Sequence, residues 1–72
     1  DYDVFDSCLG IISSRSGNGS FIELDNGETA FCYNDLRAGT KVLCSILRPA
    51  IGAKRKLVSI DSIIYEQGVL SY

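Results

Sequence analysis

Aromatic and basic side chains recur in two parts of this 72-residue chain. Three rings, Phe21, Phe31 and Tyr33, stand in two short segments rich in strand-forming residues. A basic run, Lys54-Arg55-Lys56, lies further along the chain, and Arg15 precedes the first ring. Exposed rings stack on nucleic-acid bases, and cationic side chains follow the phosphate backbone. These residue types are therefore candidates for a site that holds single-stranded RNA or DNA.

Whether the three rings share one face depends on the hairpin that joins their segments. The pair Asn26-Gly27 predicts a tight turn. If the loop is the three residues 25–27, with its glycine left-handed, Phe21 faces Phe31 and Tyr33 shares their outer face. If the loop is the Asn-Gly pair alone, Phe31 turns into the core, where a large ring buries much apolar area. Phe21 points outward in either register.

Charge is distributed unevenly along the chain, although the net charge is only −2. Residues 1–36 hold one Arg and seven acids, a net −6, whereas residues 37–72 hold six basic residues and two acids, a net +4. A net acidic chain argues against tight nucleic-acid binding, because phosphate neutralisation supplies most non-specific affinity. The basic run is then either a local patch, which Arg15 and Arg48 could extend, or a solvated loop that contributes solubility.

The residue types argue against several functions. The chain has no histidine, which excludes imidazole catalysis and histidine-ligated metal sites. The cysteines Cys8, Cys32 and Cys44 are odd in number, lack C-x-x-C spacing and lie in apolar stretches, so we expect buried free thiols and a reducing, cytoplasmic location. Gly17-Asn18-Gly19 lacks the third glycine of a dinucleotide fingerprint. We therefore expect a non-catalytic protein with no catalytic residue, no metal and no cofactor. No apolar run approaches the roughly 20 residues of a membrane span, so we expect no membrane partner.

Strand signals follow one another at short, regular spacing, and no window sustains the period of an amphipathic helix. Gly10 is expected at a bend or bulge of the first strand. Leu36 is expected to plug the core from a short link in which Gly39 is left-handed. Ile63-Ile64-Tyr65 and Val69-Leu70 predict a tail that adds a short strand or a helix. The predicted strands, separated by turn residues, are Phe5–Ser13, Ser20–Leu24, Glu28–Tyr33, Lys41–Leu47 and Arg55–Ile63, with a loop over 13–19.

A chain of this length makes one domain and buries only about 60% of its unfolded surface. Five strands joined mostly by hairpins, with one short link that is not a strand, predict an all-β fold. We expect a small five-stranded Greek-key barrel of the OB-fold type, with an SH3-like barrel as the alternative. The domain spans residues 1–72, with a core at about 5–64 and a tail at 65–72. Because Asp1 opens the chain and no Met occurs, we expect an excised domain or a processed product.

Several short motifs occur in an order typical of one family. Gly19–Leu24 reads Gly-Ser-Phe-Ile-Glu-Leu, close to a Gly-Ala-Phe-Val-Glu-Leu second strand, and Leu36 with Gly39–Val42 is similar to Leu-x-x-Gly-x-x-Val. Gly10-Ile11-Ile12 precedes them, and Arg55–Ser59 is similar to a closing Arg-Ile-x-Leu-Ser. From Gly10 to Ile60 the chain therefore resembles the S-one RNA-binding domain, an OB-fold module found in ribosomal proteins and ribonucleases.

The resemblance implies roles for individual residues. It places the family's stacking aromatic at Phe21, its third-strand ligand residue, usually histidine, at Tyr33, and its basic residue opening the last strand at Arg55. Two family positions differ, because Asn18 stands where an aromatic is usual and the Arg48-Pro49 region replaces an acidic residue. The implied function is weak binding of single-stranded RNA or DNA. The alternative is a protein-interaction or architectural OB-fold module, in which the acidic first half or an exposed strand edge contacts a partner domain.

Overall fold

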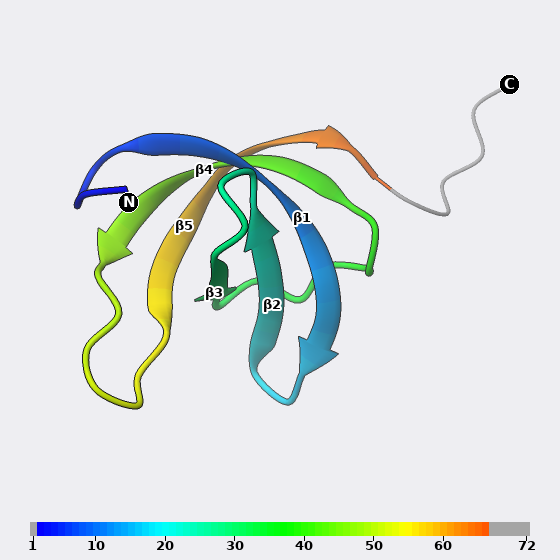
Figure 1. Cartoon of the computed structure of the whole chain (residues 1–72). Helices are drawn as coiled ribbons and strands as arrows, with labels where there is room; N and C mark the ends of the chain where they lie inside the picture. The colour runs from blue at the N-terminus through cyan, green and yellow to red at the C-terminus, as the bar shows by residue number, and fades with distance from the viewer. Residues whose placement is uncertain (1, 67–72) are drawn as a thin grey trace, which may run out of the picture.

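The computed structural model describes residues 2–66, and within this range all regular secondary structure is strand. None of the described residues belongs to a helix long and apolar enough to cross a membrane. The five strands follow one another in the chain as β1 (Ser7–Ser16), β2 (Gly19–Leu24), β3 (Thr29–Cys32), β4 (Lys41–Arg48) and β5 (Lys56–Tyr65), as Figure 1 shows.

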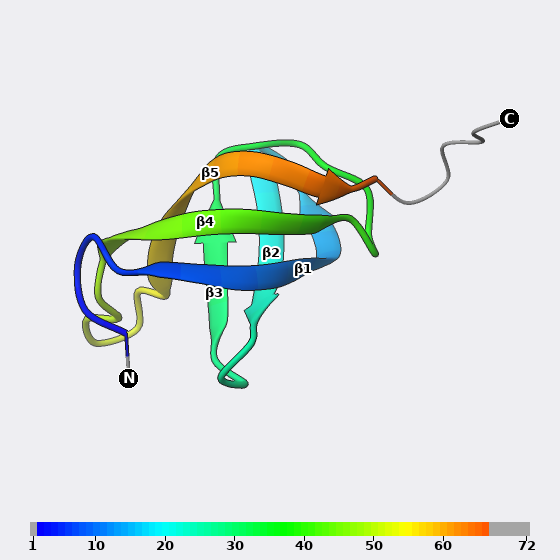
Figure 2. The same ribbon diagram turned by 90° about the horizontal axis from the view of Figure 1, so that it is seen from above.

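The strands close into a barrel in the order β1-β2-β3-β5-β4, and β4 pairs with β1. The β3–β5 pairing is parallel and consists of the pairs Ala30–Lys56 and Phe31–Leu57, whereas the other strand pairs are antiparallel. In Figure 2, β1, β4 and β5 run side by side, and β2 and β3 cross behind them. This arrangement confirms the predicted all-β, five-stranded OB-fold barrel.

Aliphatic and sulfur-containing side chains fill the barrel, among them Ile12, Ile22 and Val42. All three cysteines are buried free thiols, as predicted. The Sγ atoms of Cys8 and Cys44 lie 3.3 Å apart. Burial raises the pKa of both thiols, which keeps them neutral near pH 7. Leu36 packs against this core from the link between β3 and β4, also as predicted.

β1 pairs with β2 along one edge and with β4 along the other, and Gly10 takes part in both pairings. A Cβ atom at Gly10 would stand 2.6 Å from Cδ1 of Ile22, so the close packing there requires glycine. The irregularity of β1 comes later, between Ile12 and Ser14. That bulge adds local twist and helps the strand bend around the barrel.

β1 also begins and ends later than predicted. Phe5 lies before the strand in a turn closed by a 3.0 Å backbone bond from Asp6 to Asp3, with a φ of 71° and 80% of its surface exposed. Local hydrogen bonding in this acidic segment thus competes with strand formation. Ser14–Ser16, expected in a loop, pair with β2 because the chain turns at Gly17-Asn18, one residue before the Asn-Gly signal.

The remaining strand ends differ from the predictions by one or two residues. β3 is shorter at both ends, and β4 continues through Arg48. β5 starts one residue later and includes Ile63–Tyr65, so this part of the expected tail is strand. Val69-Leu70 lies outside the described residues. Gly39 has a φ of 90°, which confirms the left-handed conformation expected in the link before β4.

The hairpin between β2 and β3 turns through three residues, Asp25-Asn26-Gly27. The amide of Leu24 donates to the Glu28 carbonyl at 2.8 Å, and the amide of Gly27 donates to the Leu24 carbonyl at 2.9 Å. Gly27 has a φ of 91°, a left-handed conformation suited to glycine. The Asn26 Oδ1 accepts from the Glu28 amide at 3.0 Å, which stabilises the turn locally. Of the two registers open to the sequence, the structure has the one set by a three-residue loop.

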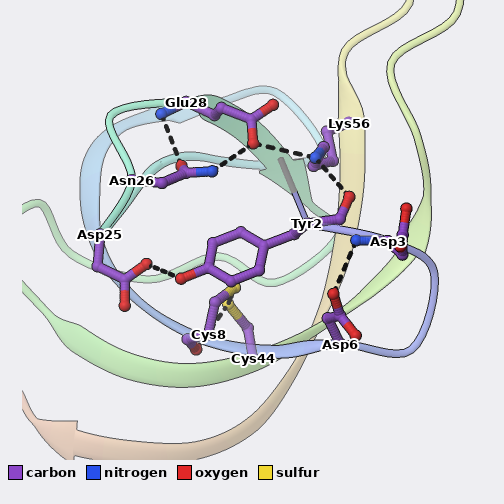
Figure 3. Close-up of polar contacts among 9 residues, drawn as sticks. All are labelled: Tyr2, Asp3, Asp6, Cys8, Asp25, Asn26, Glu28, Cys44 and Lys56. Atoms are coloured by element: carbon purple, nitrogen blue, oxygen red, sulfur yellow. Dashed lines mark hydrogen bonds and ion pairs between the residues drawn. The ribbon is translucent and has the colours of Figure 1, made fainter.

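Polar side chains close one end of the barrel (Figure 3). Lys56 is only 3% exposed, and its Nζ lies 3.1 Å from both Oε1 of Glu28 and the carbonyl oxygen of Tyr2. The Tyr2 hydroxyl donates to Asp25, and this bond raises the Tyr2 pKa to about 12. Asn26 donates to the same Glu28 oxygen. The N-terminal segment is therefore fixed to the β2–β3 hairpin and to β5.

We expect Lys56→Gln to lower the free energy of unfolding by about 2 kcal/mol at neutral pH, because it removes the positive charge beside Glu28 and shortens the side chain that donates to both Glu28 and the Tyr2 carbonyl. Urea unfolding followed by circular dichroism measures this loss. Lys41→Gln is the matched control, since Lys41 is exposed at the start of β4. A loss no larger than that of the control would contradict the structural role of Lys56.

The same network makes the stability of the fold depend on pH in the acidic range. Hydrogen bonds from Asn26 and Lys56 lower the pKa of Glu28, so its stabilising effect is complete above the unfolded value near 4.3 and disappears as pH falls through the folded value. From about pH 5 to about pH 3 we expect the wild-type protein to lose more stability than Glu28→Gln. Urea midpoints across this range provide the measurement, with Glu23→Gln on the exposed face of β2 as the control. Parallel pH profiles for wild type and Glu28→Gln would refute this expectation.

Candidate nucleic-acid interface

The hairpin register brings the three predicted rings together on the outside of the barrel. Phe21 of β2 pairs directly with Phe31 of β3. Their ring centroids are 5.4 Å apart with planes at 67°, and those of Phe31 and Tyr33 are 5.2 Å apart at 85°. Edge-to-face contacts of this kind are favourable for aromatic pairs. We call Phe21, Phe31 and Tyr33 the aromatic row.

The members of the aromatic row differ in exposure. Phe21 and Phe31 are half-buried, whereas Tyr33, just after the end of β3, is 65% exposed. The segment that carries Tyr33 is held by the buried Ser20 hydroxyl, which donates to the Asn34 carbonyl at 2.7 Å and accepts from the Leu36 amide at 3.1 Å. Tyr33 is thus an exposed ring on an anchored backbone.

Gly19 makes room for the middle ring of the row. A Cβ atom there would lie 2.6 Å from Cζ of Phe31, and it would also collide with the Cys32 carbonyl oxygen. Any larger residue would therefore displace the ring or the strand end. The glycine that opens β2 is a packing requirement of the aromatic row, and the turn itself lies at Gly17-Asn18.

Basic side chains meet the aromatic row from the loop between β4 and β5. The guanidinium carbon of Arg55 lies 5.0 Å from the Phe21 ring centroid, within the range of a cation–π contact. Arg48, at the end of β4, donates from Nη2 to the Arg55 carbonyl at 3.0 Å. A groove of about 420 Å³ runs between these elements, and its walls are formed by the aromatic row with Arg48, Lys54, Arg55, Ser16, Asn18 and Leu57.

The structure does not bring two of the predicted basic residues to this groove. Lys56 points into the closed end of the barrel, where it is buried and bonded to Glu28, so the expectation of a ligand contact for it is not supported. Successive strand residues face opposite sides, which separates it from Arg55. Arg15 forms an exposed ion pair with Asp35, with Nε and Oδ1 2.9 Å apart, and it does not line the groove.

The groove also includes residues outside the predicted set of site residues. Leu57 follows from strand alternation, because it lies two residues after Arg55. The sequence indicates Arg48 only as a possible extension of the basic patch, and it lines the groove. Asn18, which stands at a family aromatic position, and Ser16 reach the groove because the first hairpin turns at Gly17-Asn18.

Acidic and sulfur-containing side chains do not gather into a metal site in the part of the chain that is described. Among residues 2–66 there is no group of three or more Cys, Asp or Glu side chains placed to hold a metal ion. The residues that line the groove offer ring stacking, cation–π contact and charge-assisted hydrogen bonding.

The chain was compared with protein-family models, with curated proteins and with solved structures. No match was found in any of the three comparisons. The functional interpretation of this protein therefore depends on the geometry and chemistry of the groove.

Proposed function

We propose that this barrel is a non-catalytic module that binds single-stranded RNA or DNA in the groove beside the aromatic row. The observation that carries the proposal is the convergence on one groove of three rings and three cations that come from several strands and connections. Stacked rings hold bases without regard to sequence, and cations hold the backbone. The resemblance to the S-one RNA-binding domain agrees with this assignment.

Tyr33 is the principal stacking residue in this proposal. It is the most exposed ring of the row, with 65% of its surface accessible to a base. Phe21 has a smaller role, because it is half-buried and Arg55 lies over its ring. The Arg55 guanidinium contributes a second flat surface, since guanidinium planes also stack on bases.

The proposed binding is weak and strongly dependent on salt. Only three cations line the groove, and the whole chain carries a net charge of −2, so long-range attraction of a polyanion is small. Stacking contributes about 1 to 3 kcal/mol per base, and this short row provides for one or two bases.

A second candidate function, contact with a partner protein domain, is favoured by one observation. At the end of β5, Ile63, Ile64 and Tyr65 expose 47%, 54% and 55% of their surfaces. This part of the strand pairs with β4, and the parallel pairing to β3 involves only the start of β5. Exposed apolar strand ends of this kind are suited to protein contacts.

Replacing Tyr33 with Ala should weaken binding of a short oligouridylate at least about fivefold, because one stacking surface is lost. Tyr33→Phe keeps the ring and should bind like the wild type. Anisotropy of a labelled oligonucleotide at low salt gives these affinities.

Tyr65→Ala is the control for this experiment, since Tyr65 is also an exposed tyrosine but lies at the far end of β5 from the groove. If Tyr33→Ala and Tyr65→Ala bind equally well, the groove is not the site. If the wild type binds no oligonucleotide at millimolar concentration, the nucleic-acid proposal fails and the partner-protein candidate remains.

The affinity should fall as salt rises, with a slope of log K against log salt of about −2 when the three cations neutralise about three phosphate charges of a single strand. Arg55→Gln should make this slope shallower by about 0.7, since one contact is removed. Arg37→Gln, an exposed residue outside the groove, should leave the slope unchanged. Equal slopes for wild type and Arg55→Gln would exclude Arg55 from the interface.

A further inference from the structure

None of the three groove cations forms an ion pair in the described part of the chain. Within residues 2–66, ion pairs with N···O distances up to 4.0 Å join Arg15 to Asp35 and Lys56 to Glu28, and none involves Arg48, Lys54 or Arg55. Like charges gathered without a counter-ion raise the local positive potential. An anion that enters this end of the groove therefore relieves repulsion as well as gaining attraction.

The hydrogen bonding of Arg48 favours contact with such an anion. Its Nη2 donates to the Arg55 carbonyl at 3.0 Å, which ties the guanidinium to the loop between β4 and β5. Its Nε is buried and has no acceptor. An unpaired buried donor costs free energy, so a small side-chain shift that admits a ligand oxygen beside Nε gains a charge-assisted hydrogen bond. Arg48 thus supplies a fixed guanidinium rather than a freely moving charge.

The dimensions of the groove limit how much ligand it holds. Its volume of about 420 Å³ is near the lower end of the range for small-molecule sites. The cations lie at the β4–β5 loop, and the aromatic row forms the wall contributed by β2 and β3. One base on Tyr33 together with one phosphate among the cations accounts for both parts of the groove.

We propose that the groove captures the end of a nucleic-acid strand, with a terminal phosphate held by Arg48, Lys54 and Arg55 and the adjoining base stacked on Tyr33. This inference rests on the proposed function and refines its ligand. A terminal phosphomonoester carries a charge of about −1.5 to −2 at pH 7, whereas an internal phosphodiester carries a single charge. Three cations without acidic partners match the more highly charged group.

The test compares three short oligouridylates of equal length, one with a 5′-phosphate, one with a 3′-phosphate and one with hydroxyl groups at both ends. Chemical-shift titrations of the wild-type protein at matched ionic strength give the affinities. One of the two phosphorylated strands should bind about fivefold more tightly than the hydroxyl-ended strand, and its identity assigns the polarity of the bound end. Equal affinities for all three would overturn the terminal-phosphate proposal while leaving the proposed function intact. Absence of binding by all three would overturn both.

Variants of the groove cations test whether these residues cause the preference for a strand with a terminal phosphate. Lys54→Gln changes an exposed loop residue and should reduce the preference for the phosphorylated strand to less than about twofold. Arg48→Gln should do the same, and its circular dichroism spectrum shows whether it is folded. If it is not, Lys54→Gln decides the matter alone. Arg37→Gln serves as the control and should keep the full preference. A full preference in Lys54→Gln would show that the terminal phosphate is recognised elsewhere and would overturn the assignment.

Discussion

The three-residue turn Asp25-Asn26-Gly27 is the constraint on which the rest of this structure depends. Its left-handed glycine and its backbone bonds set the register of β2 against β3, and that register places Phe21 opposite Phe31. The side chains of the same turn also contribute to the closed end of the barrel, where Asp25 accepts from Tyr2 and Asn26 donates to Glu28. A shift of one residue would reverse the side chains of β3 relative to β2, so Phe31 would turn into the core and the aromatic row would be lost.

The basic run and the residue after it contribute both to the closure of the barrel and to the groove. β3 and β5 meet through two parallel pairs, which carry Lys56 opposite Ala30 and Leu57 opposite Phe31. Because side chains alternate along a strand, Lys56 enters the barrel end while Arg55 and Leu57 face the groove. Two neighbouring cations therefore have unrelated tasks. One stabilises the fold by neutralising Glu28, and the other remains available to a ligand.

The sequence predicted the elements of the barrel well and its details less well. Strand number and fold class followed from hydrophobic patterning, which depends on local residue types. The sequence did not determine the hairpin register. Asn26-Gly27 fits a loop of two or of three residues, and these loops differ in their backbone torsion angles. Phe5 was predicted to open the first strand because large apolar residues are common in strands. It lies instead in a turn formed by the acidic segment around it. The groove joins residues of all five strands and of three connections between them, a proximity that no local pattern contains.

The distribution of aromatic residues connects the stability of this small chain to its proposed role. Among residues 2–66 the buried apolar side chains are those of Ile, Leu, Val, Ala and Cys, with Ile12, Ile22 and Ile46 among the largest. A chain of this size has little apolar area to spare, and burying Phe21 and Phe31 would have gained more than leaving them half-exposed. Their edge-to-face packing recovers part of that loss and fixes the rings before any ligand arrives. Rings that are held in place lose little entropy on binding, which favours the proposed binding of a base by a groove with few contacts.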